Sequence, residues 1–278
     1  MDRRRHVKRG VRRIARRILG PRTMEEARLL ERAIGRDGPG VLLDVGAHVG
    51  STLLPFAEAG WAVHAFEPDR VNRAQLERNT SHLPNVNIVP MAVAEEAGEL
   101  TLYRSDESTG ITSLTPFTGG HRPVEVVPVT TLTAYLDEAR PLEVTLLKID
   151  VEGYERFVLN GFPWSHYRPR GIMLEFEDRK TSDLGYVWTD LAEDLRSQGY
   201  HVFVSEWKPI ERYGVAHRWT RFFSYPGALH EQDGWGNILA VQASDRARLR
   251  RALLFAAGRH KLRRLAGALE LKLESLRG

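Results

Sequence analysis

Acidic side chains at the ends of apolar stretches are the residues of this chain best suited to chemistry. Asp44 lies near the end of one such stretch, and Glu67 and Asp150 close two others. Glu175 and Glu177 end a fourth. Uninterrupted apolar stretches are typical of strands buried on both faces of a parallel sheet, and the carboxyl ends of such strands meet at one edge. The sequence therefore predicts a polar crevice whose carboxylates can bind hydroxyls, hold a cation or accept a proton.

The stretch VLLDVGAHVG, residues 41–50, predicts a strand that runs into a tight turn and then into a helix beginning near Gly50. Gly46 and Gly50 allow the backbone to turn sharply and to approach a ligand closely, which a Cβ would obstruct. His48 stands where a pyrophosphate-binding turn has its middle glycine. This pattern favours a zwitterionic ligand such as S-adenosylmethionine, although a glycine pair without any ligand is also common in α/β proteins.

The second predicted strand, residues 61–69, ends in Glu67 and is stopped by Pro68. An acid about 20 residues beyond a glycine turn can accept hydrogen bonds from both hydroxyls of an adenosine ribose. We therefore predict that Glu67 binds the ribose of the cofactor. The alternative is a solvent-facing acid at a strand end.

The third predicted strand, residues 85–93, is expected to bring Met91 and Ala92 beside the first two strand ends. There they would contact the adenine of the cofactor, with packing in the core as the alternative role. Two further strands are predicted on either side of a loop, 105–123, that is rich in Ser, Thr and Gly. A loop this long in a compact domain is usually functional or mobile, and we predict a lid or a substrate loop.

A second informative block is VTLLKIDVEGYE, residues 144–155. Its apolar part predicts another buried strand, and Asp150 at its end faces the same crevice as Asp44 and Glu67 if the sheet is parallel. Lys148 lies within the apolar part, so its side chain must either extend to solvent or pair with an acid.

The composition excludes several classes of protein. At 278 residues the chain is long enough for one sizeable domain with additions, or at most two small ones. It contains no cysteine, which excludes disulfides, thiolate catalysis and cysteine-bound zinc. It has no stretch of about 18 uncharged apolar residues and no signal peptide, so we expect a cytoplasmic protein.

Charge is strongly segregated along the chain. Residues 1–22 and 245–278 each carry ten Lys or Arg, against one and three acids respectively. Residues 23–244 keep 20 basic and 32 acidic side chains, a net charge of −12. An acidic body disfavours the phosphates of nucleic acids. The two basic arms could bind an anionic membrane surface or nucleic acid, or could be solvated helix faces.

These patterns divide the chain into basic N-terminal helices over 1–39, an α/β domain over 40–244 and a basic helical tail over 245–278. Residues 3–19 place a narrow apolar stripe on a cationic helix, and Thr23 is predicted to cap a second helix. The tail is predicted to be a helix or a helix pair that docks on the body, on a second copy or on a membrane. Its apolar residues at helical spacing are Leu249, Leu253, Leu262, Leu265, Leu269 and Leu276.

The motifs together resemble a known family. DVGAHVG at 44–50, FEP at 66–68, KIDVEGYE at 148–155 and the strand ending in Glu175 resemble the FkbM-type methyltransferases, a branch of the class I S-adenosylmethionine-dependent enzymes. The resemblance covers roughly 40–205, and KIDVEGYE is its most specific part. It implies a Rossmann-like, doubly wound, mostly parallel sheet of seven strands with the last strand antiparallel, and it makes the central part a methyltransferase domain.

The resemblance also implies which residues bind S-adenosylmethionine. By this resemblance, Glu67 binds the ribose and Asp150 lies in the region beside the sulfonium. The sequence departs from the family at His48, where asparagine is usual. The residues expected at the cofactor are Asp44, Gly46, Ala47, Gly50, Glu67, Pro68, Met91, Ala92 and Asp150.

Members of the family methylate hydroxyl oxygens, often of sugars. A sugar hydroxyl is a poor nucleophile and needs a general base or a metal ion to draw off its proton. Asp150 is the preferred base, with His48 and His121 as further candidates. Alternatively Asp150, Glu175 and Glu177 hold a Mg²⁺ ion that binds the hydroxyl, because carboxylate oxygens suit this ion.

The predicted activity is thus O-methylation of a sugar in a glycan, glycolipid or glycosylated natural product. An RNA or protein methyltransferase is opposed by the acidic body and by the absence of an Asn/Asp-Pro-Pro-aromatic block. A third hypothesis is a cofactor-binding scaffold anchored to the inner face of a membrane. A nicotinamide dehydrogenase is disfavoured because His48 replaces a required glycine.

If residues 3–19 form a helix on a membrane surface, deleting them is expected to abolish binding to anionic vesicles and to leave turnover in solution intact. Co-sedimentation of the full and the truncated chain with anionic and neutral vesicles checks this. Equal binding of both chains to anionic vesicles would exclude the membrane role.

Overall fold

The computed structural model describes the chain except for residues 1–24, 107–109, 111, 118, 213–216 and 276–278. The predicted helix over 3–19 and its neighbour's predicted cap at Thr23 lie outside the described residues. The second helix itself begins at Glu26, with Glu25 at the cap position.

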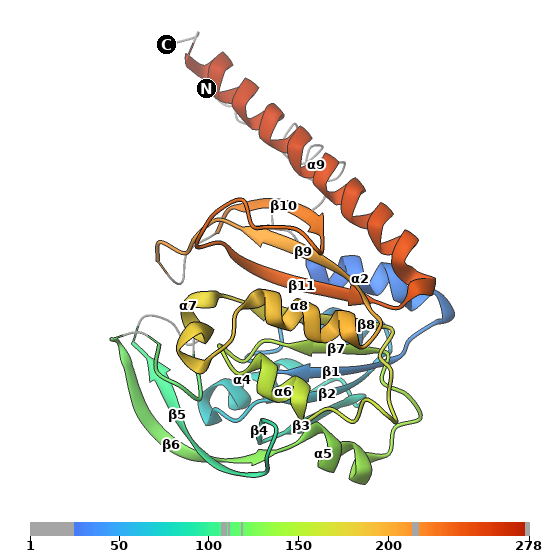
Figure 1. The fold of residues 1–278 in the computed structure, drawn as a ribbon, viewed down its shortest axis with the longest axis vertical. Helices are drawn as coiled ribbons and strands as arrows, with labels where there is room; N and C mark the ends of the chain where they lie inside the picture. The colour runs from blue at the N-terminus through green and yellow to red at the C-terminus, as the bar shows by residue number, and fades with distance from the viewer. Residues whose placement is uncertain (1–24, 107–109, 111, 118, 213–216, 276–278) are drawn as a thin grey trace.

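An eight-stranded sheet forms the middle of the molecule (Figure 1). Its strands are β1 (Val41–Val45), β2 (Ala62–Phe66), β3 (Val86–Val89), β7 (Leu146–Ile149), β8 (Gly171–Phe176), β9 (His201–Trp207), β10 (Trp219–Ser224) and β11 (Trp235–Val241). They lie in the order β10-β9-β11-β8-β7-β1-β2-β3. Strand β1 pairs in parallel with β2 and β7, and β3 and β8 extend the parallel part on either side.

The predicted sheet is confirmed in type and corrected in strand number. Strand β11 runs antiparallel between β8 and β9, so the expected reversed last strand is present. The prediction of seven strands is wrong, because β10 folds back on β9 and adds an eighth. Its sequence, WTRFFS, is rich in the aromatic residues that favour strands, but it lacks the apolar and polar alternation that would mark it.

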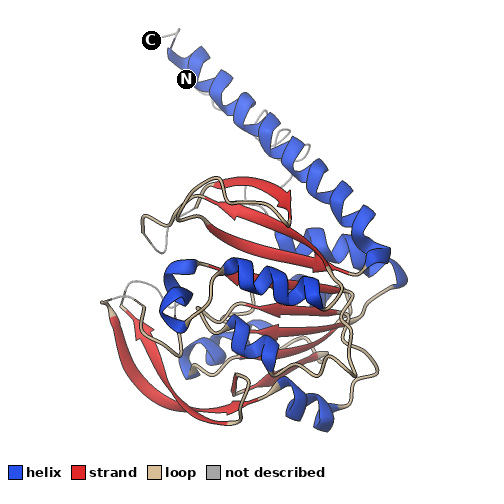
Figure 2. Cartoon of the chain, in the orientation of Figure 1, coloured by secondary structure: helices blue, strands red, loops and turns tan. Residues whose placement is uncertain are grey.

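Helices cover both faces of the sheet (Figure 2). They are α2 (Glu26–Ile34), α3 (Leu54–Glu58), α4 (Arg70–Thr80), α5 (Leu132–Ala139), α6 (Glu155–Asn160), α7 (Asp178–Thr181), α8 (Trp188–Ser197) and α9 (Ala243–Ser275), with short 3₁₀ turns at Gly35–Asp37 and Ser182–Leu184. Apolar residues of α5, α6 and α8 pack on one face, and those of α2, α3, α4 and α9 pack on the other. The architecture is therefore the predicted doubly wound one.

Side-chain caps decide where two of the helices start. Asp69 accepts hydrogen bonds from the backbone N–H groups of Val71 (2.7 Å) and Asn72 (2.9 Å) and so begins α4. Thr131 accepts one from Ala134 (2.9 Å) and begins α5. The helix predicted to start near Gly50 begins four residues later, at Leu54.

A second, three-stranded sheet lies beside the main one, at the lower left of Figure 1. It consists of β4 (Ala92–Val93), β5 (Gly98–Ser105) and β6 (His121–Thr130). The third predicted strand is therefore divided at Pro90, with β3 in one sheet and β4 in the other. The guanidinium of Arg104 on β5 pairs with Asp69 at 2.5 Å, which ties the small sheet to the start of α4.

Helices α2 and α9 belong to the same hydrophobic core. Leu30 and Ile34 of α2 and Leu249 and Leu253 of α9 are all buried in one cluster. Arg248 of α9 donates a hydrogen bond to the backbone carbonyl of α2 residue 33 (2.9 Å). The start of the basic tail therefore packs on the sheet, while the limits of the three predicted parts stay a prediction.

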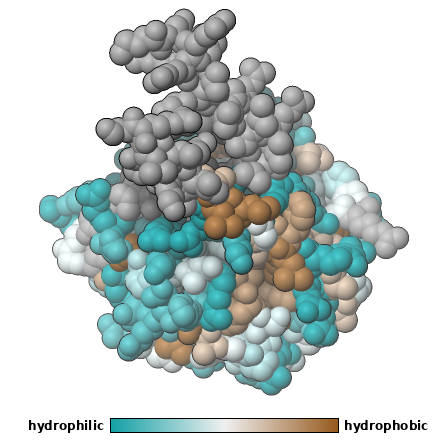
Figure 3. All heavy atoms as spheres, turned by 90° about the horizontal axis from the view of Figure 1, so that it is seen from above, coloured by the Kyte–Doolittle hydropathy of each residue, from teal (hydrophilic) through white to brown (hydrophobic). Residues whose placement is uncertain are grey.

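Beyond its first turns α9 leaves the body as one helix (Figure 1). Its side chains there include exposed apolar ones at Leu254, Phe255, Leu262 and Leu265. Seen from the end where α9 projects, hydrophobic patches lie among hydrophilic side chains (Figure 3). No helix within the described part of the chain is both long and apolar enough to cross a membrane.

Replacing Leu249 by Ala is expected to lower the free energy of unfolding by about 2–5 kcal/mol, because it opens a cavity in the core. Leu262→Ala, a control on the exposed part of the same helix, is expected to change it by no more than about 0.5 kcal/mol. Urea unfolding of both variants measures the difference. Equal losses would contradict the packing of α9 described here.

Candidate functional site

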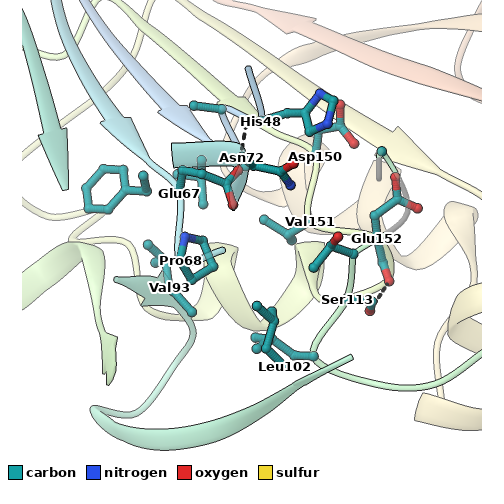
Figure 4. Close-up of a pocket in the computed structure, with 18 of the residues that line it drawn as sticks. His48, Glu67, Pro68, Asn72, Val93, Leu102, Ser113, Asp150, Val151 and Glu152 are labelled. Atoms are coloured by element: carbon teal, nitrogen blue, oxygen red, sulfur yellow. Dashed lines mark hydrogen bonds between the residues drawn. The ribbon is translucent and has the colours of Figure 1, made fainter. Parts of the chain in front are cut away.

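A cavity opens at the carboxyl ends of β1, β2 and β7 (Figure 4). The empty space in and around its open mouth is about 830 Å³. Its apolar wall consists of Phe66, Met91, Ala92, Val93, Leu102 and Leu114. The other walls carry polar groups from the β1 turn, from the end of β2 and from the turn after β7. The sequence-predicted crevice is therefore present at the predicted edge of the sheet.

The glycine turn forms the floor of this cavity. Gly46 has φ +79°, and a Cβ added there would lie 1.9 Å from the carbonyl oxygen of Asp150, so only glycine allows the β1 turn to touch the end of β7. Gly46 and Ala47 both donate backbone hydrogen bonds to Phe66 of β2 and both line the cavity. Gly50, at φ +88°, packs against the side chain of Leu76 instead. Although it was predicted to bind the cofactor, Gly50 is not among the residues lining the cavity.

The buried side chain of Lys148 connects the end of β1 to the end of β7. Its ammonium lies 2.9 Å from a carboxylate oxygen of Asp44 and 3.5 Å from one of Asp150, and it donates a 2.7 Å hydrogen bond to the carbonyl of Gly46. Burial alone would lower the pKa of Lys148, but the charges of the two acids outweigh it and hold the pKa above its ordinary value. Of the two alternatives predicted for Lys148, the structure shows pairing with an acid. Asp44 was expected at the cofactor, but it is fully buried beneath the cavity and serves as the counter-ion of Lys148.

Glu67 occupies the position expected of a ribose-binding acid. Its two carboxylate oxygens accept hydrogen bonds from the backbone N–H groups of His48 (2.7 Å) and Asp69 (2.9 Å). Burial raises its pKa to about 7, although these two hydrogen bonds favour the charged form. Each oxygen has a second lone pair with which to accept a ribose hydroxyl. Pro68 lines the cavity beside it, so this end of the site fits an adenosine.

Three acids converge next to the cavity. Asp150, Glu152 and Glu175 each bring one carboxylate oxygen within 4.8 Å of the others. Asp150 and Glu152 line the cavity, and Glu175 lies behind them at the end of β8. Glu152 was not among the predicted site residues, so the cluster contains one acid that the sequence did not assign to the site.

Of the three predicted magnesium ligands, the structure brings Asp150 and Glu175 together, but Lys180 already pairs with acids of this cluster. The ammonium of Lys180 lies 2.5 Å from Glu152 and 2.9 Å from Glu175, so the oxygens that would face a metal ion already bind a cation. Glu177, the third predicted ligand, lies outside the cluster and pairs with Lys180 at 3.1 Å and with Arg179 at 2.6 Å. A Mg²⁺ ion placed among these acids would meet the positive charge of Lys180.

The two histidines proposed as alternative bases occupy different places. His48 lines the cavity, has a left-handed φ of 51°, and lies near Asp150 in Figure 4. Burial lowers its pKa, which favours the neutral ring that can accept a proton. His121 contacts the ring of Phe117 with 4.5 Å between centroids and is not among the residues lining the cavity.

Several residues of the site could not be assigned from the sequence. The loop predicted as a lid or substrate loop does supply part of the cavity wall, through Gly110, Thr112, Ser113 and Leu114. Ser113 donates a 2.8 Å hydrogen bond to the carbonyl of Glu152 and thereby ties this loop to the turn after β7. The composition of the loop was the only sign of its role in the sequence, and it indicated the segment but not the individual residues.

Comparison with known proteins identifies the family. The profile described as Methyltransferase FkbM domain matches residues 44–202, more than half of the chain. The chain belongs to this family. It is therefore an S-adenosylmethionine-dependent methyltransferase, and the resemblance seen in the motifs is confirmed. A search of curated proteins found no match.

Solved structures similar to this FkbM methyltransferase share little of its sequence. The precorrin-6y C5,15-methyltransferase of Geobacter metallireducens GS-15 is 14% identical, with a TM-score of 0.42 over 78% of this chain and 87% of that one. The magnesium protoporphyrin IX methyltransferase of Synechocystis PCC 6803, solved with bound S-adenosylmethionine, is 13% identical, with a TM-score of 0.41 over 82% and 89%. The 23S rRNA methyltransferase ErmE is 13% identical, with a TM-score of 0.41 over 78% and 66%. Similarity this low says nothing about the substrate of the FkbM methyltransferase.

The raised pKa of Glu67 predicts that cofactor affinity depends on pH. If Glu67 binds the ribose as predicted, the ribose hydroxyls donate to its ionised carboxylate. With a pKa of about 7, the affinity for S-adenosylhomocysteine is then expected to be about tenfold weaker at pH 6 than at pH 8. In the absence of ligand, the effect of Glu67 on folding stability depends on pH in the opposite direction. The contribution of Glu67 falls as pH rises from its ordinary pKa of 4.5 towards 7, because the folded protein retains a proton that the unfolded chain has released.

Calorimetric titration at both pH values measures the effect, with Glu67→Gln as the control that cannot ionise. The variant is expected to bind weakly and equally at both. An equal pH dependence in the variant would assign the titration to another group.

Proposed function

We propose that this methyltransferase transfers the methyl group of S-adenosylmethionine to a hydroxyl of a sugar, with Asp150 as the general base. The observation that carries the proposal is the exposure of Asp150. Its side chain is 38% exposed in the cavity, whereas the side chains of Glu152 and Glu175 are only 10% and 14% exposed. Asp150 is thus the acid of the cluster best placed to touch both cofactor and acceptor.

The residues of the cavity fit the cofactor. Glu67 would accept the ribose hydroxyls, Met91 and Ala92 would contact the adenine, and the backbone of Gly46 and Ala47 would lie along the rest of the molecule. When bound, S-adenosylmethionine supplies a methyl group on a positively charged sulfur. Much of the acceleration of such a transfer comes from positioning, and the fixed strand ends supply that.

Asp150 is positioned for the proton. Lys148 holds one of its carboxylate oxygens at 3.5 Å, which orients the group at the end of β7. In the proposed reaction the hydroxyl oxygen attacks the methyl carbon, the bond from this carbon to sulfur breaks, and the hydroxyl proton passes to Asp150. The products are a methyl ether and S-adenosylhomocysteine, so charge and atoms balance.

The charge around the acceptor side favours a neutral polyol. Carboxylates accept hydrogen bonds from hydroxyl groups and repel phosphates, and residues 23–244 carry a net charge of −12. A sugar presents several hydroxyl donors in fixed directions. An RNA acceptor would bring a phosphate backbone towards the acids of this cluster.

The test is formation of S-adenosylhomocysteine with a panel of free sugars, glycosides, glycolipids and RNA. With a sugar acceptor, Asp150→Asn is expected to lower kcat by about 10²–10⁴-fold, because the general base is lost. Its affinity for S-adenosylhomocysteine is expected to change by less than about tenfold. Asp233→Asn, on an exposed acid away from the site, is the matched control.

Two results would overturn the proposal. Full turnover by Asp150→Asn together with loss of turnover in His48→Gln would make His48 the base. Methylation of RNA or protein without any methylation of the hydroxylated acceptors would contradict the sugar substrate.

A further inference from the structure

Lys180 is a buried cation surrounded by acids from two segments, the turn after β7 and the end of β8. Its ammonium lies 2.5 Å from Glu152, 2.9 Å from Glu175 and 3.1 Å from Glu177, and its side chain is only 2% exposed. The ring of Phe117, from the loop 105–123, lies 5.4 Å from the ammonium and contributes a cation–π contact. A lysine desolvated to this degree is stable only with such a set of partners.

The backbone near Lys180 is shaped to make these contacts. Glu152 has a left-handed φ of 57°, which is uncommon for a residue with a side chain, and Gly153 follows with φ 108°. A Cβ on Gly153 would lie 3.2 Å from the carbonyl oxygen of Lys180, so the turn after β7 packs closely against α7. A conformation of this kind persists when its surroundings hold it, and it is common at functional sites. The ion pair to Lys180 is such a restraint on Glu152.

The positive charge of Lys180 favours the ionised form of the acids around it. Burial raises the pKa of Glu152 to about 7 and raises that of Glu175 well above its ordinary value, and the positive charge of Lys180 opposes both shifts. Without a cation the two carboxylates would repel each other and Asp150 across less than 5 Å. A divalent metal ion is the usual solution for such a group of oxygens.

We propose that Lys180 replaces a metal ion in the acceptor subsite and acts as its positioning residue. Its ammonium holds Glu152 beside Asp150 with the support of Glu175 behind them, so that the remaining lone pairs of Glu152 receive a neighbouring hydroxyl of the acceptor while Asp150 takes the proton. This role rests on the proposed function, because it assumes that the acceptor enters next to Asp150. It also makes turnover independent of divalent cations.

The proposal is tested by asking whether removal of the lysine creates a metal site. Mn²⁺ binding, followed by electron paramagnetic resonance, is compared in the full chain, in Lys180→Met and in the double variant Lys180→Met/Glu175→Gln. The intact protein is expected to bind no stoichiometric Mn²⁺ at millimolar concentration. Lys180→Met is expected to bind one equivalent, and the double variant is expected to lose it. Lys208→Met, which removes a lysine paired with Glu231 elsewhere, is the control and gains no site.

Stoichiometric Mn²⁺ binding by the intact protein that disappears in Glu175→Gln would overturn the proposal. A folded Lys180→Met that binds no Mn²⁺ would overturn it as well. Lys180 does not line the cofactor cavity, so binding of S-adenosylhomocysteine within about threefold of the intact protein reports that the variant is folded. If Lys180→Met does not fold, the intact protein and Lys180→Arg decide the question, since the arginine keeps the charge and is expected to bind no Mn²⁺.

Steady-state kinetics separate positioning from a merely structural role. Lys180→Met is expected to raise KM for the acceptor at least tenfold and to leave KM for S-adenosylmethionine unchanged, and Lys180→Arg is expected to recover part of the loss. Turnover of the intact protein is expected to be the same with and without EDTA. Failure of the intact protein to bind S-adenosylhomocysteine would contradict the proposed function and leave the Mn²⁺ comparison standing.

Discussion

The close approach of the β1 turn to the end of β7 is the constraint on which the site depends. Gly46 leaves room for the carbonyl of Asp150, and Lys148 bonds to the turn and to the acids of both strands. Neither feature would suffice alone, because the glycine permits contact and the lysine compensates the buried charge that the contact creates. As a result the acid proposed to take the proton opens into the same cavity as Glu67, the acid proposed to hold the ribose.

Two lysines thus give the site its electrostatic character. Lys148 lines the cavity and pairs with Asp44 and Asp150, whereas Lys180 lies outside the lining and pairs with Glu152 and Glu175. Each lysine is buried against carboxylates, so its charge is compensated within the protein. Ser113 donates a hydrogen bond to the carbonyl of Glu152, so the loop that forms part of the cavity wall is connected to the turn that carries the acid cluster.

Much of this arrangement was predictable because it depends on local patterns. Apolar stretches that end in acids located the edge of the sheet. The number of residues between Gly46 and Glu67 matched the spacing expected between a glycine turn and a ribose-binding acid. The partners of a buried charge depend on tertiary contacts, so Asp44 was assigned to the cofactor although it pairs with Lys148. Lys180 was missed for the same reason, since its partner Glu152 lies 28 residues away in the sequence. Strand β10 was missed because its side chains show no alternation.

The eighth strand also changes how the sheet ends. Without it, β9 would present seven residues of regular, unpaired backbone, the kind of edge on which other chains can add strands and aggregate. Strand β10 covers that edge with a shorter strand whose register shifts between Trp219 and Arg221. A bulged border carrying a charged arginine is a poor template for another strand. The extra strand therefore protects the protein against edge-to-edge association, at the border farthest from β3 and remote from the cofactor cavity.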